Sequence, residues 1–129
     1  MMRFPHSFHS LDELGATTVE FAVIASAFVM MLVGGMHLSM LGFTAANLHY
    51  ATEHGARCGA VQTTRCTSST SAQSAAAAAF QNITGQTATF TATPTASCGY
   101  QMVGSVTYAL QTGFSRINVP LSATACYPT

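Results

Sequence analysis

The distribution of apolar residues divides the chain into two parts. From Phe21 to Met36 nearly every residue is apolar, and from Phe21 to Thr52 there is no aspartate, glutamate, lysine or arginine. A helix needs about 20 such residues to cross the hydrocarbon core of a bilayer. The sequence therefore predicts one long helix over residues 16–62, of which about residues 19–42 span a membrane.

The second half of this predicted helix is amphipathic, so its apolar face needs a cover. Leu41, Ala45, Leu48 and Thr52 recur on one side at helical spacing. At about 1.5 Å per residue the whole helix would reach about 70 Å, more than twice the apolar thickness of a bilayer. The half beyond the membrane is therefore expected to pack against residues 63–129.

Residues 63–129 are predicted to form a small α+β domain. The serine- and alanine-rich stretch from Thr70 to Asn82 predicts a short helix, because serine caps helices well and alanine is the strongest helix former. Three stretches of alternating polarity predict an antiparallel sheet of about three strands. They are a strand within Thr87–Thr95, ended by Pro94; Tyr100–Leu110, in which Gly104 suggests a bulge; and Ile117–Cys126, in which Pro120 predicts an edge strand. The apolar set expected to be buried on the third strand is Ile117, Val119, Leu121, Ala123 and Ala125.

Charged residues are scarce, which excludes several functions. Only 6% of the 129 residues are charged, against about 25% in typical soluble proteins. Four arginines and no lysine cannot form the basic face that nucleic-acid binding requires. There is no paired-carboxylate set beyond the leader, no nucleophile with a histidine base and no phosphate-binding loop. The sequence therefore predicts no enzyme, no cofactor, no metal, no nucleic acid and no small-molecule substrate.

All four cysteines follow the apolar segment, and their even number predicts disulfides in an oxidising compartment. They are Cys58, Cys66, Cys98 and Cys126. A zinc site is disfavoured, because there is no CxxC pair and no histidine after His54. Three pairings are possible. If the last two strands form a hairpin, opposed residue numbers sum to about 227, which favours Cys98–Cys126 and leaves Cys58–Cys66 to close a short loop.

Two features at the N-terminus need explanation. Residues 1–15 show no helical stripe and are predicted to be a leader or a disordered arm. Glu20 then places a carboxylate at the start of the apolar segment, although a carboxylate at the bilayer centre costs about 2.5–3.5 kcal/mol on insertion scales. One explanation is that Glu20 complements the helix dipole, which is worth about 0.3–1 kcal/mol. His37 is ionisable too, and its role stays open between a functional group and a neutral imidazole hydrogen-bonded within a bundle.

A sequence resemblance offers another explanation for Glu20. GATTVEF, from Gly15 to Phe21, resembles the processing site of type IV pilins. The downstream run GGMHLSMLGFTAANLHYATEHGARCGA narrows this resemblance to the TadE-like minor pseudopilins of tight adherence (Tad/Flp) pili. The run EHGAR, from Glu53 to Arg57, matches the ending of that family's N-terminal segment. The resemblance covers about Gly15 to Ala60.

This resemblance implies a pilin-like fold and a processing reaction. A prepilin peptidase would cut between Gly15 and Ala16, next to the motif residues Glu20 and Phe21, and so remove residues 1–15. The Glu20 carboxylate would then pair with the N-terminal ammonium of a neighbouring subunit. The implied partners are the membrane, the peptidase, other pilins and pseudopilins, and the Tad assembly machinery. The implied role is pilus biogenesis and adhesion, from a single-pass position in a bacterial inner membrane with the C-terminal domain in the periplasm or the pilus.

Two alternatives remain at the sequence level. The chain could be an uncleaved single-span anchor that carries a small extracytoplasmic binding module. It could also be a secreted protein in which Phe21–Gly35 is the apolar region of a signal peptide, with Ala25-Ser26-Ala27 as a cleavage-like motif. The mature N-terminus distinguishes the three, because they predict starts at Ala16, at Met1 and beyond residue 35.

Overall fold

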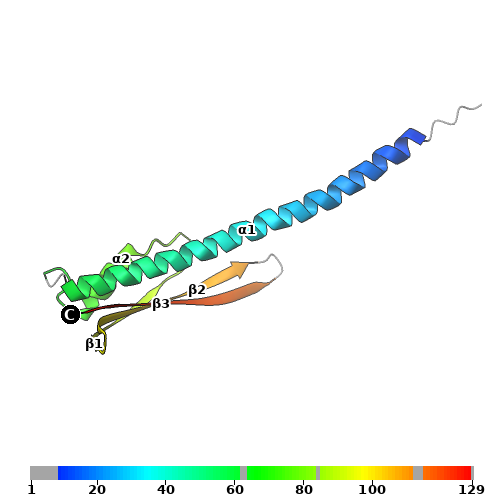
Figure 1. The fold of residues 1–129 in the computed structure, drawn as a ribbon. Helices are drawn as coiled ribbons and strands as arrows, with labels where there is room; N and C mark the ends of the chain where they lie inside the picture. Colours follow the sequence, from blue (N-terminus) through cyan, green and yellow to red (C-terminus); the bar gives the residue numbers. More distant parts are fainter. Residues whose placement is uncertain (1–8, 62–63, 84, 112–114, 129) are drawn as a thin grey trace, which may run out of the picture. The chain divides into compact units, whose positions relative to one another are not determined.

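The computed structural model describes residues 9–61, 64–83, 85–111 and 115–128. Its elements, in chain order, are α1 (His9–Val61), α2 (Ser69–Ala79), β1 (Thr89–Ala96), β2 (Gly99–Gln111) and β3 (Arg116–Tyr127) (Figure 1). A long apolar N-terminal helix, a short helix, a three-stranded antiparallel sheet and two disulfides confirm the predicted fold class. The chain divides into two units, residues 1–38 and residues 39–129.

Helix α1 begins at His9 instead of Ala16, so residues 9–15 of the expected leader are helical. The stretch contains no proline, and one glycine in a helix interior costs only about 1 kcal/mol relative to alanine. Gly15 therefore does not end the helix. For residues 9–15 the alternative of a disordered arm was therefore wrong, residues 1–8 lie outside the described part, and the leader and its removal stay a prediction.

The N-terminal unit exposes large apolar side chains along α1. Phe21 is 73% exposed and Met31 is 78% exposed, and the exposed set runs from Val19 to Leu38. The hydroxyl of Ser26 donates to the Val23 carbonyl oxygen at 2.8 Å. Such a bond satisfies a polar side chain without water, as a membrane interior requires.

In the C-terminal unit, one face of α1 is buried against α2 and the sheet. Leu48, Thr52 and Ala56 are at most 1% exposed, and the Thr52 hydroxyl donates to the Leu48 carbonyl oxygen at 2.7 Å. This confirms that residues 63–129 cover the amphipathic half of the helix. One apolar cluster joins Leu48 to the sheet, and a second joins Ala56 to both α2 and the sheet. The first contains Leu48, Val106 and Ala123, and the second contains Ala56, Cys58, Cys66, Ala72, Tyr100 and Met102.

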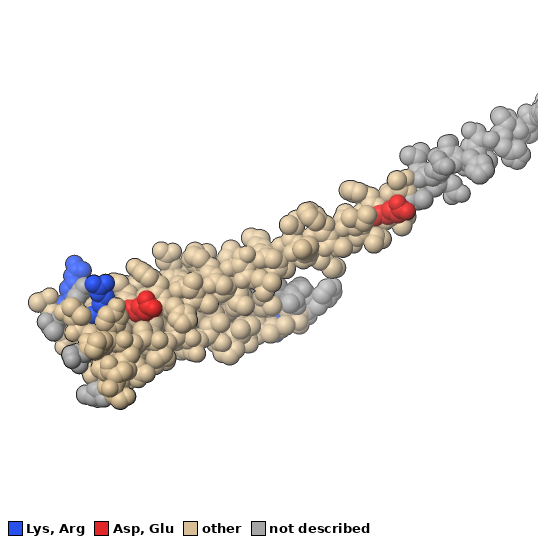
Figure 2. Space-filling model, viewed as in Figure 1, with Lys and Arg blue, Asp and Glu red and all other residues tan. Residues whose placement is uncertain are grey.

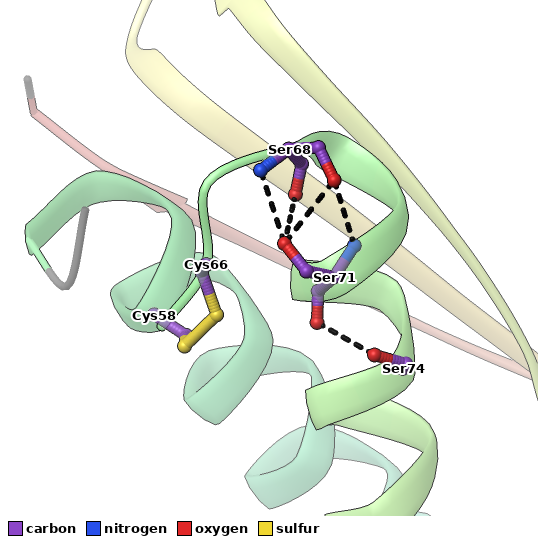
Figure 3. The surroundings of a disulfide bond; sticks show 5 residues. All are labelled: Cys58, Cys66, Ser68, Ser71 and Ser74. Atoms are coloured by element: carbon purple, nitrogen blue, oxygen red, sulfur yellow. Dashed lines mark hydrogen bonds between the residues drawn. A yellow bond between two sulfur atoms is a disulfide. The ribbon is translucent and has the colours of Figure 1, made fainter. Parts of the chain in front are cut away.

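Helix α2 starts at a serine capping box just after the first disulfide. The backbone N–H of Ser71 donates to the Ser68 hydroxyl oxygen at 3.2 Å, and the backbone N–H of Ser68 donates to the Ser71 hydroxyl oxygen at 3.0 Å (Figure 3). This exchange satisfies two backbone donors that the helix itself cannot pair. Cys58 and Cys66, which form the disulfide, fix the loop that enters α2 (Figure 3).

The sheet has the strand order β1-β2-β3, with both pairs antiparallel. The β2–β3 register runs from Tyr100 opposite Tyr127 to Gln111 opposite Arg116, which is the predicted hairpin register. Cys98 and Cys126 are bonded at its open end, so the disulfide pairing favoured from the sequence is confirmed. Gly99 follows with φ +112°, a backbone conformation that strongly favours glycine.

Three details of the sheet differ from the sequence predictions. Strand β1 does not end at Pro94, and the only register irregularity in its pairing with β2 lies between Thr93 and Ala96. Gly104 is therefore not a bulge; a side chain there would collide with Phe90 of β1 and with α1. Of the five apolar residues predicted to be buried on β3, only Ala123 is buried, whereas Val119, Leu121 and Ala125 are half-buried and Ile117 is 50% exposed.

Pro120 lies on β3, which is an edge strand as predicted. It pairs with Thr107 of β2 inside an unbroken register. A proline cannot donate to a ladder, so within a sheet it is tolerated where its nitrogen faces away from the partner strand. The outer side of β3 consequently lacks one backbone donor at this position.

Candidate functional site

The residues predicted for processing lie consecutively on α1. Gly15 is exposed, and a Cβ placed on it would meet no atom within 4 Å. Ala16 is part of the same helix, although its side chain lies outside the described part of the structure. Glu20 and Phe21 are both exposed. The backbone around Gly15 is therefore uncrowded by the described parts of its own chain.

Glu20 is a carboxylate without a described counter-charge. It makes no ion pair or hydrogen bond with the residues that the structure describes, and residues 9–38 contain no arginine or lysine. Its helical neighbours are exposed apolar side chains such as Val19 and Ile24. A carboxylate in apolar surroundings is costly unless it is paired or protonated. The described part of the N-terminal unit does not supply a cationic partner.

The helix that carries Glu20 fits a membrane span. Within the described residues, one helix is long and apolar enough to cross a bilayer, with a mean hydropathy of 2.0 over its best 18 residues. Length and composition alone support this assignment. The visible surface in Figure 2 agrees with it, because charged side chains are rare and most of the surface is uncharged.

The EHGAR run divides into packing residues and exposed residues. Gly55 and Ala56 are buried, whereas Glu53, His54 and Arg57 are exposed. A Cβ on Gly55 would lie 2.7 Å from the Cβ of Ala76 and 2.9 Å from the Cε of Met102. The small residues of the run therefore let α1 approach α2 and β2 closely, and the exposed ones leave a polar face.

Gly55 belongs to a seam of small residues that was not predicted from the sequence. Gly59, one helical turn later, lies directly under the ring of Tyr100, so a side chain there would collide with the aromatic carbons. On α2 the buried residues are Ala72 and Ala76, again four apart. The pairs Gly55/Gly59 and Ala72/Ala76 could have indicated this seam in the sequence, because residues four apart share a helix face.

Together, the apolar N-terminal helix, which is long enough to cross a membrane, and the small disulfide-bonded α+β domain fit a single-pass membrane protein. The sequence model of the TadE-like protein family matches residues 15–57, which is the segment from the predicted cleavage glycine to the end of EHGAR. Searches among curated proteins and solved structures gave no significant match. The TadE-like match confirms the resemblance seen in the sequence and suggests involvement in a Tad pilus system.

Proposed function

We propose that the chain is a minor pseudopilin of a Tad-type pilus that acts in pilus biogenesis and adhesion. A prepilin peptidase processes it between Gly15 and Ala16, and the mature chain assembles with other pilins and pseudopilins. It has a structural role and no catalytic activity. Before assembly it lies in a bacterial inner membrane as a single-pass protein, with residues 63–129 outside the cytoplasm.

The observation that carries this proposal is the extent of the family match. It begins at Gly15 and includes Glu20, the apolar segment and Arg57. The exposed backbone at Gly15 supports recognition by a peptidase, because a glycine presents no side chain to the enzyme. The segment before Gly15 is excluded from the match, which agrees with a leader that is removed.

Glu20 has a specific role in the proposed assembly. Cleavage creates an ammonium at Ala16, and Glu20 is the fifth residue of the product. Two copies side by side can place the carboxylate of one near the ammonium of the other, so that the two opposite charges compensate each other within the apolar surroundings. Pairing in a poor dielectric offsets desolvation only when the geometry is good. The contact therefore fixes the register between subunits more than it adds to their affinity.

The first test is the mature N-terminus, measured by mass spectrometry on protein from cells with an active prepilin peptidase. The expected start is Ala16. Gly15→Leu should block cleavage, whereas Gly42→Leu, at another helical glycine with no atom within 4 Å, should leave it intact. A start at Met1 in the unchanged chain would favour the uncleaved anchor, and a start beyond residue 35 would favour the secreted protein.

The second test separates cleavage from assembly. Glu20→Ala and Glu20→Gln should both be cleaved, and their incorporation into sheared pili should fall about fivefold or more, as expected for a loss of about 1 kcal/mol. Glu53→Gln is the matched control, because Glu53 is an exposed carboxylate on the same helix. Equal incorporation of Glu20→Ala and the unchanged chain would contradict the pairing role.

A further inference from the structure

The two disulfides of the C-terminal unit differ in their exposure. Cys58 and Cys66 are 4% and 7% exposed, and both belong to the second apolar cluster, which joins α1 to α2 and the sheet. Cys98 is exposed and Cys126 is half-buried, and neither belongs to an apolar cluster of the described residues. The rate at which a disulfide is attacked depends on access to its sulfur atoms. Cys98–Cys126 is therefore the more accessible of the two bonds.

Cys98 lies at the tip of a tight turn. Ser97 and Cys98 form the turn between β1 and β2, and both residues are exposed. The two strands pair directly beside this turn, at Ala96 and Gly99. Exposed loop tips are the preferred sites of proteolytic cleavage in many domains, so another protein can reach them. The position of Cys98 thus permits the approach of a second protein as well as of a small thiol.

The sheet and its turns carry no acidic side chain. From His54 to Thr129 the sequence contains no aspartate or glutamate, and Glu53 on α1 supplies the one acidic side chain of residues 39–129. The nucleophile in disulfide exchange is a thiolate. A carboxylate beside the bond would repel that thiolate. The strands and the turn next to Cys98 therefore place no negative side chain in the way of the attack.

Other contacts hold the sheet together when Cys98–Cys126 is open. Strands β2 and β3 pair without interruption from Tyr100 and Tyr127 to the far end of the hairpin. Tyr100 belongs to the second apolar cluster, and Tyr127 packs against it. Reduction of Cys98–Cys126 should therefore leave the sheet folded. Reduction of Cys58–Cys66 requires the second apolar cluster to open first, because both of its cysteines are buried there.

We propose that Cys98–Cys126 is a thiol–disulfide exchange site, which a dithiol opens and re-forms in the folded chain while Cys58–Cys66 stays oxidised. One thiolate of the dithiol attacks the Cys98 sulfur and forms a mixed disulfide, and Cys126 leaves as a thiolate that takes a proton from water. The second thiol loses its proton, attacks the dithiol's own sulfur in the mixed disulfide and releases Cys98. The dithiol is oxidised by two electrons, and the cysteine pair is reduced by two.

The reverse reaction forms the bond again and returns the two electrons to the other protein or small molecule. The inference goes beyond the proposed role in pili. It does not require cleavage at Gly15 or pairing of Glu20, because both of its cysteines lie in the C-terminal unit.

The test measures the reduction rate of each disulfide in the full chain in lipid nanodiscs. The protein is treated with dithiothreitol or with reduced thioredoxin and quenched with N-ethylmaleimide, and peptide mass spectrometry identifies the alkylated cysteines. Cys98 and Cys126 should be alkylated about tenfold faster than Cys58 and Cys66, because access limits the attack. The stabilisation expected from loop length favours the opposite order, since the longer loop is stabilised more by its disulfide.

The same chain unfolded in guanidinium chloride is the matched control, because both disulfides are then accessible and the tenfold difference should disappear. The dispersed NMR signals of the sheet amides should persist in the folded chain while only Cys98–Cys126 is reduced. Reduction by both reagents would assign the site to protein dithiols, and reduction by dithiothreitol alone would assign it to small thiols. Equal rates in the folded chain, faster reduction of Cys58–Cys66, or loss of the sheet signals would overturn the proposal.

Discussion

The two halves of α1 differ in whether their apolar side chains are exposed or buried. The N-terminal half exposes large side chains such as Phe28 and Met31, which are 59% and 78% exposed. The C-terminal half buries small ones, with Ala51, Thr52 and Ala56 at 0%. Large exposed side chains suit a lipid environment, whereas small ones allow close approach of other backbone segments.

The difference teaches where the stability of each half originates. The C-terminal half is stabilised by contacts with α2 and the sheet, so it depends on residues of its own chain. The described residues of the N-terminal unit give their apolar side chains no such cover. Changes in the C-terminal unit should therefore alter unfolding, and changes in the N-terminal unit should alter membrane insertion.

Removal of the Cys98–Cys126 disulfide should have the largest effect on unfolding. The chain-entropy estimate is about 3.6 kcal/mol for its span of 28 residues and about 2.5 kcal/mol for the span of 8 closed by Cys58–Cys66. Each pair is replaced by serines, and the free energy of unfolding is measured by hydrogen exchange at β2 amides in nanodiscs. A larger loss of unfolding free energy on removal of Cys58–Cys66 would contradict this ranking. A change in membrane insertion would contradict the expectation that the C-terminal unit does not affect it.

An arginine in the N-terminal unit should act on the membrane alone. Phe28→Arg should make insertion less favourable by about 3 kcal/mol, because a charged side chain near the bilayer centre is poorly tolerated. The fraction that resists alkaline carbonate extraction should fall, while hydrogen exchange in β2 stays unchanged. Phe28→Leu, which keeps an apolar side chain, should behave as the unchanged chain. Full retention of Phe28→Arg in the membrane would argue against the span.

Gly59→Ala should destabilise the C-terminal unit by about 2 kcal/mol, because overpacking of a close contact costs about 1–3 kcal/mol. The added methyl would collide with the ring of Tyr100. Gly42→Ala is the control, since no atom lies within 4 Å of its Cβ position, and alanine there improves helix propensity by up to about 1 kcal/mol. Urea unfolding of both variants measures the contrast. Equal effects would mean that the seam at Gly59 is not tightly packed.

The smallest effect is expected at alkaline pH and again concerns the C-terminal unit. Burial raises the pKa of Tyr100 above its ordinary value of 10.0. The unfolded chain then loses this proton at a lower pH than the folded chain. The protonation of Tyr100 therefore contributes fully to the free energy of unfolding below pH 10.0, and this contribution decreases as the pH rises above it. Tyr100→Phe should show a weaker decrease in unfolding free energy above that pH, and Tyr50→Phe, at an exposed tyrosine, should show none of this change. Parallel curves for Tyr100→Phe and the unchanged chain would contradict the burial effect.

The sequence was sufficient for features that depend on local periodicity. The β2–β3 register followed from two alternating strands, and the register in turn selected Cys98–Cys126 as a pair. The candidate membrane span followed from a long uncharged run. In each case the signal lies within one segment or between two neighbouring segments, where spacing determines which side chains meet.

Features that depend on distant contacts were not predictable. Gly104 suggested a bulge, but its small size serves the approach of α1 and β1 instead. The contact between Gly59 near the end of α1 and the ring of Tyr100 at the start of β2 joins distant parts of the sequence, and no periodicity indicates it. A glycine in a sequence indicates either a close contact or an unusual backbone conformation, and only the folded structure shows which neighbouring residue makes that contact.

The proline in the outer strand limits how copies of this protein can join. Pro120 removes a backbone donor from the free side of β3, and β1 carries Pro94 within its irregular stretch. Strand-by-strand extension from one molecule to the next is thus disfavoured, as in other proteins that resist cross-β stacking. A pilus of the kind proposed above would therefore not be joined through these strand edges.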